Sequence, residues 1–165
     1  IAKVAQSYQV GGGWGATSEK RMMKEILRNG PINGDFQAPK IFSIYREGIF
    51  SEKGLIDIHR KHQEAVQLAQ SSIKEEAPVS DKTANQRGIS WVEMNHSVVI
   101  IGWGKDKENG MPYWIVRNSY GPNWGMNGDF FVKRGGNDFG MEVEQIAFEP
   151  LLCADDSTSE KCNPV

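Results

Sequence analysis

The hydrophobic and polar positions change their spacing along the chain, and each spacing predicts a different element. In residues 3–10 apolar and polar side chains alternate, as in a half-buried strand, and a glycine-rich turn follows. From residue 17 onward apolar positions recur three and four residues apart, which predicts a helix with one apolar face. That face consists of Met22, Met23, Ile26 and Leu27.

The ends of this helix are also marked in the sequence. Thr17 or Ser18 can act as the N-cap, because a short hydroxyl side chain can accept a hydrogen bond from the first turn. Gly30 and Pro31 predict the stop. A short strand around 32–36 follows, and after it comes a cluster of aromatic residues: Phe42, Tyr45 and Phe50.

Residues 51–90 have a different character from the segments on either side. Residues 57–78 form a polar helix candidate with a thin apolar stripe, and residues 79–88 have the polar composition of a linker. We therefore interpret 51–90 as an insertion on the surface of the domain.

Strand-like patterns return after residue 91, separated by turns that contain glycine and asparagine. The predicted strands are 96–103, 111–118, 128–134 and 141–149. Residues 97–101 are almost continuously apolar, which predicts a strand buried on both faces. A helix followed by four strands predicts an α+β domain over 1–150, with an antiparallel sheet or half barrel, and a polar tail at 151–165.

Composition and charge restrict the classes of protein that fit this pattern. The chain has 165 residues, of which 39% are hydrophobic, so it can build a packed core. Its net charge of −2 offers no basic field to attract nucleic acid or an anionic membrane. The longest apolar run, 98–101, is too short for a membrane span. The first residue is Ile1, which fits a processed product, an isolated piece or an artificially chosen start.

The two cysteines, Cys153 and Cys162, both lie in the polar tail. The simplest interpretation is a local or interchain disulfide in an oxidising compartment. A metal site there is disfavoured, since no histidine lies near them in the sequence, and the acidic surroundings do not favour a reactive thiolate. His59 and His62 share a helix face, which we interpret as a solvated face. We therefore expect no metal site.

A histidine and an asparagine stand at the ends of two predicted strands. His96 opens the strand 96–103, and Asn118 ends the strand 111–118. Adjacent antiparallel strands would bring the two side chains together, so that the Asn118 oxygen accepts from one imidazole nitrogen and the other nitrogen serves a nucleophile. The alternative is a structural histidine and an ordinary turn residue.

The sequence around these two residues resembles papain-like cysteine proteases. "NHSVVIIGWG" and "YWIVRNSYGPNWG" are similar to the family's histidine and asparagine segments. Upstream, "SEKRMMKEILRNGPI" and "FSIYREGIF" are similar to its helix and its aromatic element. The resemblance covers about 1–50 and 91–149. "YQVGGGWGATSE" and "GMPYWIVRNS" are most similar to the cathepsin C (dipeptidyl peptidase I) branch.

The resemblance implies a fold and a set of partners. The fold is the right-hand antiparallel β half-barrel of a papain-like catalytic domain, with one helix and 51–90 as an inserted helical and loop segment. In such proteases the nucleophilic cysteine lies ~130–150 residues before the histidine, which places it outside this chain. The cysteine and the oxyanion-hole glutamine would belong to a separate upstream chain. An N-terminal exclusion domain and a higher oligomer are further implied partners.

The resemblance also implies roles for residues around the histidine. His96 would pair with the thiolate and transfer protons, and Asn118 would orient the imidazole. Asn95 is the polar residue that precedes the histidine, and Trp124 keeps the second tryptophan of the asparagine turn. Tyr120 stands where the family has the first tryptophan, so we expect weaker shielding of the His–Asn hydrogen bond and unchanged chemistry.

Glu144 is the candidate for substrate selection. The resemblance of "FGMEVEQI" places it at the base of the pocket for the substrate's second residue, where a carboxylate favours a basic or polar side chain. The alternative is that Glu144 points to solvent from an alternating strand. Phe139 replaces a half-cystine of the family, so an apolar contact should replace that disulfide. The cathepsin C branch binds chloride through tyrosines, but one of those positions is Gln9 here, next to Tyr8.

These features predict a peptidase that needs no cofactor and removes N-terminal dipeptides from peptide or protein substrates. Two other functions fit the same sequence: a catalytically inactive papain-like binding or scaffold protein, and a papain-like endopeptidase. The resemblance implies a lysosome-like or vacuole-like compartment, a secretory vesicle, or secretion.

Overall fold

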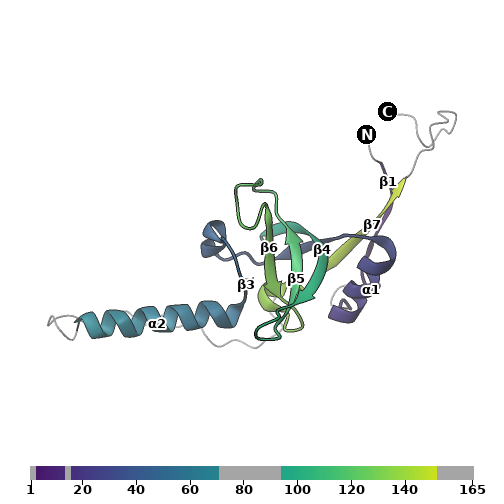
Figure 1. Ribbon diagram of the computed structural model, residues 1–165. Helices are drawn as coiled ribbons and strands as arrows, with labels where there is room; N and C mark the ends of the chain where they lie inside the picture. Colours follow the sequence, from purple (N-terminus) through teal and green to yellow (C-terminus); the bar gives the residue numbers. More distant parts are fainter. Residues whose placement is uncertain (1–2, 14–15, 71–93, 152–165) are drawn as a thin grey trace.

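The computed structural model describes residues 3–13, 16–70 and 94–151, which form one seven-stranded sheet with helices outside it (Figure 1). The helices are α1 (Glu19–Asn29) and α2 (Glu52–Gln70), with the short 3-10 helices η1 (Lys40–Ile44) and η2 (Asp138–Gly140). The strands are β1 (Lys3–Gln9), β2 (Ile32–Phe36), β3 (Ile49–Phe50), β4 (His96–Lys105), β5 (Pro112–Arg117), β6 (Asp129–Lys133) and β7 (Gln145–Leu151). The α+β prediction is confirmed.

The sheet has the order β1-β7-β2-β4-β5-β6-β3, so it joins the two ends of the described chain. Its neighbouring strands are antiparallel except at one edge, where the short β3 runs parallel to β6. The expected antiparallel sheet therefore holds for all but this edge. The exception follows from the connection: after β2 the chain crosses through η1 to the far edge and arrives there in the direction of β6.

One face of the sheet carries a single apolar core. Its largest fully buried side chains include Ile32, Phe36, Ile100, Trp114, Phe130 and Met22. Met22 comes from α1, which packs against β2, β4 and β7. Complete burial of an aromatic or branched side chain contributes about 1.5–3 kcal/mol, so this core is the main source of the fold's stability.

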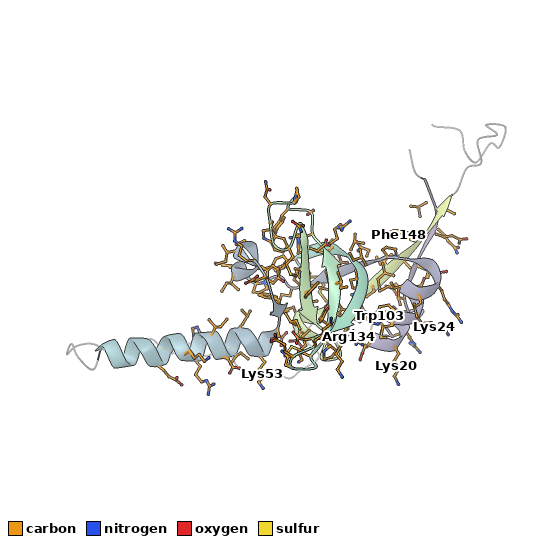
Figure 2. All side chains as sticks on the ribbon, viewed as in Figure 1. Lys20, Lys24, Lys53, Trp103, Arg134 and Phe148 are labelled. Carbon is orange, nitrogen blue, oxygen red and sulfur yellow. The ribbon has the colours of Figure 1, made fainter. Side chains whose placement is uncertain are left out.

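The predicted apolar face of α1 is correct for three of its four residues. Met22 is buried, and Met23 and Ile26 pack against the core, but Leu27 is 75% exposed. Leu27 is seven residues after Lys20 and three after Lys24, so the three side chains lie on the same side of the helix. Figure 2 shows those two lysines pointing away from the sheet, so this side of α1 faces solvent.

The stop of α1 is confirmed, but its expected side-chain cap is wrong. Gly30 has φ +99°, and its N–H donates to Ile26 O at 3.1 Å, so the position favours glycine. Ser18 stands at the N-cap but makes no capping hydrogen bond with its side chain. The Thr17 hydroxyl instead donates to Val10 O at 2.8 Å, which ties the start of the helix to the end of β1.

The prediction that residues 97–101 are buried on both faces is wrong. Val98 and Ile100 are buried in the core, whereas Ser97 and Val99 are exposed, Val99 to 40%. The period-2 alternation of a strand sends these two pairs to opposite faces. None of the elements that the structure describes covers the second face at this point.

Helix α2 begins five residues before the predicted 57 and stands apart from the sheet (Figure 1). Two hydrogen bonds explain its early start. Ser51 Oγ accepts from Gly54 N–H at 3.1 Å, and the buried Asp138 carboxylate accepts from Glu52 N–H at 2.9 Å. These bonds satisfy two of the unpaired N–H groups of the first turn.

Several predictions concern residues beyond the described ranges. The rest of the 51–90 segment after residue 70, including the linker 79–88, lies outside the described residues, and so do Cys153 and Cys162. Among the described helices none is long and apolar enough to cross a membrane.

The fourth predicted strand begins at residue 145 and not at 141, because a tight loop precedes it. The Glu142 carboxylate accepts from Gly135 N–H at 2.6 Å, which closes this loop. Phe139 adopts φ +56° there, a conformation uncommon for a side chain of its size, and stacks on Phe50 with ring centroids 4.7 Å apart. An apolar contact thus occupies the position where the family was expected to have a disulfide.

Candidate active site

The two residues predicted to meet at the end of the sheet do meet. His96 is the first residue of β4 and pairs with Phe36, the last residue of β2. Asn118 follows the last residue of β5. His96 Nε2 lies 2.8 Å from Asn118 Oδ1. Because β4 and β5 are hydrogen-bonded neighbours, the sheet itself brings together two side chains that are 22 residues apart in the sequence.

The hydrogen bonds around Asn118 determine which imidazole nitrogen carries a proton in the pair. Asn118 Oδ1 also accepts from the Ser119 backbone N–H at 2.8 Å, which identifies it as the amide oxygen. An amide oxygen can only accept, so His96 Nε2 must be the donor. His96 Nδ1 is then the nitrogen that can serve a nucleophile.

Aromatic rings surround this pair on one side. The Tyr120 ring lies 5.2 Å from the His96 ring and 5.4 Å from Trp124, measured between centroids. Trp124 is buried and donates its indole N–H to Ser43 O at 2.9 Å. Tyr120 is 48% exposed. The tyrosine therefore stands beside the imidazole as expected, with much of its own ring open to solvent.

Asn95 belongs to the scaffold of the site. Its side-chain oxygen accepts from Ala38 N–H at 2.7 Å, its amide nitrogen donates to Ala38 O at 3.2 Å, and its own N–H donates to Phe36 O. These three bonds tie the loop after β2 to the start of β4. Asn95 thereby fixes the backbone immediately before His96, a contact that its position in the sequence did not reveal.

A hollow of about 370 Å³ lies beside the histidine. It is lined by Asp35, Met94, Asn95, His96 and Ser97. The Ser97 hydroxyl donates to the Asp35 carboxylate across β4 and β2, which the sequence also did not reveal. The lining of this hollow consequently includes a carboxylate, that of Asp35.

Glu144 lies in the turn just before β7 and not on an alternating strand. It is half-buried, and its Oε1 accepts from Gln9 Nε2 at 3.1 Å. The next residue, Gln145, is fully buried and pairs with Gly34 of β2, two residues before Phe36, the partner of His96. Glu144 therefore lies near the strands that carry the His96 site, and it is held by a neutral amide.

The residues around Gln9 do not fit a bound chloride. The Gln9 amide donates to the Glu144 carboxylate, so one of its two N–H donors is engaged and a negative charge lies beside it. The neighbouring Tyr8 hydroxyl donates to Glu25 Oε1 at 2.5 Å, and this hydrogen bond, together with burial, raises the pKa of Tyr8. A second anion would be repelled at this position. In the described part of the chain, no group of three or more His, Cys, Asp or Glu could hold a metal ion.

Comparison with known sequences agrees with this geometry. Residues 79–148 match the model of the papain family of cysteine proteases. The chain is 34% identical over 143 residues to cathepsin C of Schistosoma mansoni, an alignment with 87% of this chain and 26% of that protein. It is 36% identical over 146 residues to dipeptidyl aminopeptidase 1 of Plasmodium falciparum, with 86% of this chain and 19% of that protein.

Solved structures show the same fold. A digestive procathepsin L 3 of Tenebrio molitor is similar with a TM-score of 0.57 and 23% identity, over 88% of this chain and 35% of that one. The bromelain protease of Ananas comosus is similar with a TM-score of 0.56 and 22% identity, over 88% of this chain and 50% of that one. The described domain therefore has a papain-like α+β fold.

The chain thus carries a papain-family cysteine protease segment, and over most of its length it is similar to cathepsin C and dipeptidyl aminopeptidase 1. It spans about a quarter or less of the length of those two relatives.

Proposed function

We propose that this chain is the histidine- and asparagine-bearing half of a papain-like cysteine peptidase that removes N-terminal dipeptides. The observation that carries the proposal is the 2.8 Å hydrogen bond from His96 Nε2 to Asn118 Oδ1, which leaves Nδ1 for a nucleophile. The dipeptide specificity is supported by the similarity to cathepsin C and dipeptidyl aminopeptidase 1.

The proposed reaction follows from the position of that nitrogen. A cysteine thiolate attacks the peptide carbonyl and forms a carbon–sulfur bond, while the imidazolium of His96 stabilises the thiolate beforehand. His96 then donates the Nδ1 proton to the leaving amine, and the peptide bond breaks to give a thioester. In the second step Nδ1 takes a proton from water, whose oxygen attacks the thioester. The carbon–sulfur bond breaks, the dipeptide is released, and the thiolate–imidazolium pair is restored.

The nucleophile and the oxyanion-hole glutamine would come from a separate upstream chain. Two features of the site support this arrangement. Asn118 Nδ2 is buried and has no acceptor among the described residues, and such a group bonds either to another segment or to water. Ser97 and Val99, on the second face of β4, are exposed next to the histidine. An exclusion domain that limits cleavage to dipeptides, and a higher oligomer, would belong to the same assembly.

Glu144 would select the second residue of the substrate. A half-buried carboxylate attracts a basic side chain more strongly than a fully solvated one does. The enzyme would act without chloride at Gln9, because that amide already binds the carboxylate. The proposed location of the enzyme is a lysosome-like or vacuole-like compartment, a secretory vesicle, or the exterior of the cell.

Labelling with an electrophilic dipeptide probe tests the proposal. The purified native complex is treated with the probe at acidic pH under reducing conditions, and every chain is then analysed by mass spectrometry. We expect label on a cysteine of a co-purifying upstream chain, and loss of label in His96→Ala. An intact complex without label would favour the inactive scaffold. Cleavage of internal bonds in a long peptide would favour an endopeptidase.

A further inference from the structure

The hollow beside His96 contains a carboxylate that the proposed reaction does not use. Asp35 precedes Phe36, the last residue of β2, and pairs with Ser97, the residue after His96 on β4. Strand alternation buries Phe36 in the core and leaves Asp35 half-buried on the second face of the sheet. Asp35 and His96 line the same hollow of about 370 Å³. Strand pairing therefore places a carboxylate next to the proposed catalytic histidine.

This carboxylate is only partly engaged. The Ser97 hydroxyl donates to Asp35 Oδ1. A carboxylate has about four acceptor positions on its two oxygens, so this bond leaves further positions on Oδ2. None of the ion pairs among the described residues includes Asp35. A half-buried carboxylate without a cationic partner attracts a positive group more strongly than a fully solvated one does.

We propose that Asp35 determines specificity by binding the cationic side chain of an arginine or lysine of the substrate, which enters the hollow beside His96. This inference rests on the proposed function, because it assigns a substrate group to a hollow next to the catalytic histidine of that peptidase. His96 must come within hydrogen-bond reach of the leaving amine. Consecutive residues of an extended peptide are about 3.3–3.6 Å apart, so a residue adjacent to the cleaved bond can reach the hollow with its side chain.

The lining of the hollow suits a long basic side chain. Arginine and lysine carry a charged group at the end of an apolar stem. Met94 offers an apolar surface to such a stem, and Asp35 offers a carboxylate to the charge. A guanidinium has five N–H donors, so it can donate to Asp35 Oδ2 while the Ser97 hydroxyl still donates to Oδ1. The α-ammonium group of a substrate has no stem of its own that Met94 could contact.

The experiment compares substrates that differ in charge and little in shape. The assembled enzyme is assayed with four fluorogenic dipeptides: Arg-Gly, citrulline-Gly, Gly-Arg and Gly-citrulline. The preference is the ratio of kcat/KM for arginine to kcat/KM for citrulline at the same position, so an effect on His96 that acts on both substrates cancels. In Asp35→Asn we expect this ratio to fall about 3- to 5-fold at the position that enters the hollow, through a higher KM for the arginine substrate.

Two further variants separate the charge of Asp35 from other effects. Asp57→Asn makes the same change at another half-buried carboxylate, on α2 and outside the hollow, and should keep the wild-type ratio. Ser97→Ala removes the hydroxyl but leaves the carboxylate, so most of the arginine preference should remain. Asp35→Asn itself keeps an oxygen that can accept from Ser97, so the expected loss comes from the charge.

The outcomes distinguish this inference from the proposed function. If the wild-type assembly hydrolyses none of the four substrates, the proposed function fails and the role of Asp35 fails with it. If the wild type cleaves them and Asp35→Asn keeps the wild-type ratio at both positions, only the role of Asp35 is overturned. That result includes equal losses for arginine and citrulline, which would assign the effect to His96 or to the substrate's α-ammonium. A loss in Ser97→Ala as large as that in Asp35→Asn would assign the effect to the hydrogen bond and also overturn the inference.

Discussion

The His96–Asn118 pair and the Gln9–Glu144 pair are held in place in different ways. The first pair is set by two adjacent strands and bordered on one side by the Tyr120 ring, which packs against Trp124. The second is set by the end of an edge strand and a turn. The residues proposed for catalysis thus lie on central strands of the sheet. The residue proposed to select the substrate lies at its margin, beside the edge strand β1.

The largest expected effect comes from breaking the first pair at the histidine. His96→Ala should lower kcat/KM of the assembled peptidase by at least about 1,000-fold, because both proton transfers use this ring. The change in the free energy of unfolding should stay near 1 kcal/mol, since the side chain is only half-buried. Steady-state kinetics and urea denaturation measure both. His59→Ala, at an exposed position of α2, is the control and should leave both values unchanged. Retained activity in His96→Ala would exclude a catalytic role.

Removal of the orienting group should cost less. Asn118→Ala leaves the imidazole present but free to rotate and to change tautomer, so kcat should fall by about 100-fold. Asn123→Ala, an exposed asparagine of the same turn, serves as the matched control. A loss as complete as that of His96→Ala would contradict an orienting role.

Neutralisation of the second pair should change selectivity more than rate. Glu144→Gln should lower kcat/KM for substrates with a basic second residue by about 10-fold, as for loss of a hydrogen bond to a charged group, and should affect neutral substrates less. A dipeptide library varied at the residue second from the cleaved bond, which is the N-terminal residue of each dipeptide, gives the profile. Glu149→Gln, at an exposed position of the paired strands β1 and β7, is the control. An unchanged profile would show that Glu144 does not face the substrate.

The Tyr120 ring, which lies beside His96, can be replaced by a larger or a smaller side chain. Tyr120→Trp presents a larger apolar surface to the His96–Asn118 hydrogen bond and should raise kcat/KM about twofold, whereas Tyr120→Ala should lower it severalfold. The two variants are assayed side by side with the wild type. Identical rates in all three would mean that Tyr120 does not shield the bond.

The smallest expected effect is that of chloride. Exchange of chloride for gluconate at constant ionic strength should leave kcat and KM unchanged, because the Gln9 amide already binds a carboxylate. Activity that requires chloride would show that an anion binds elsewhere or displaces this contact.

The local elements were largely predictable from the sequence. Helix α1, its glycine stop and the three strands β4, β5 and β6 followed from spacing and turn residues, because these signals act over a few positions. The start of α2 and the late start of β7 were not predicted. The start of α2 depends in part on the Asp138 carboxylate, 86 residues away in the sequence. The late start of β7 depends on the loop that the Glu142 carboxylate closes, whose conformation the strand pattern did not show.

For the candidate site, the sequence by itself determined which residue types stand at the ends of which strands, and through the resemblance it suggested their chemistry. Only the tertiary structure decided that His96 Nε2 is the donor to Asn118. The same is true of the hydrogen bonds between Asn95 and Ala38 and between Gln9 and Glu144. Strand pairing in the sheet joins segments more than a hundred residues apart, as at Gln9 and Ile146. A hydrogen bond of about 3 Å depends on that pairing to within a fraction of an ångström, and no spacing along the chain encodes it.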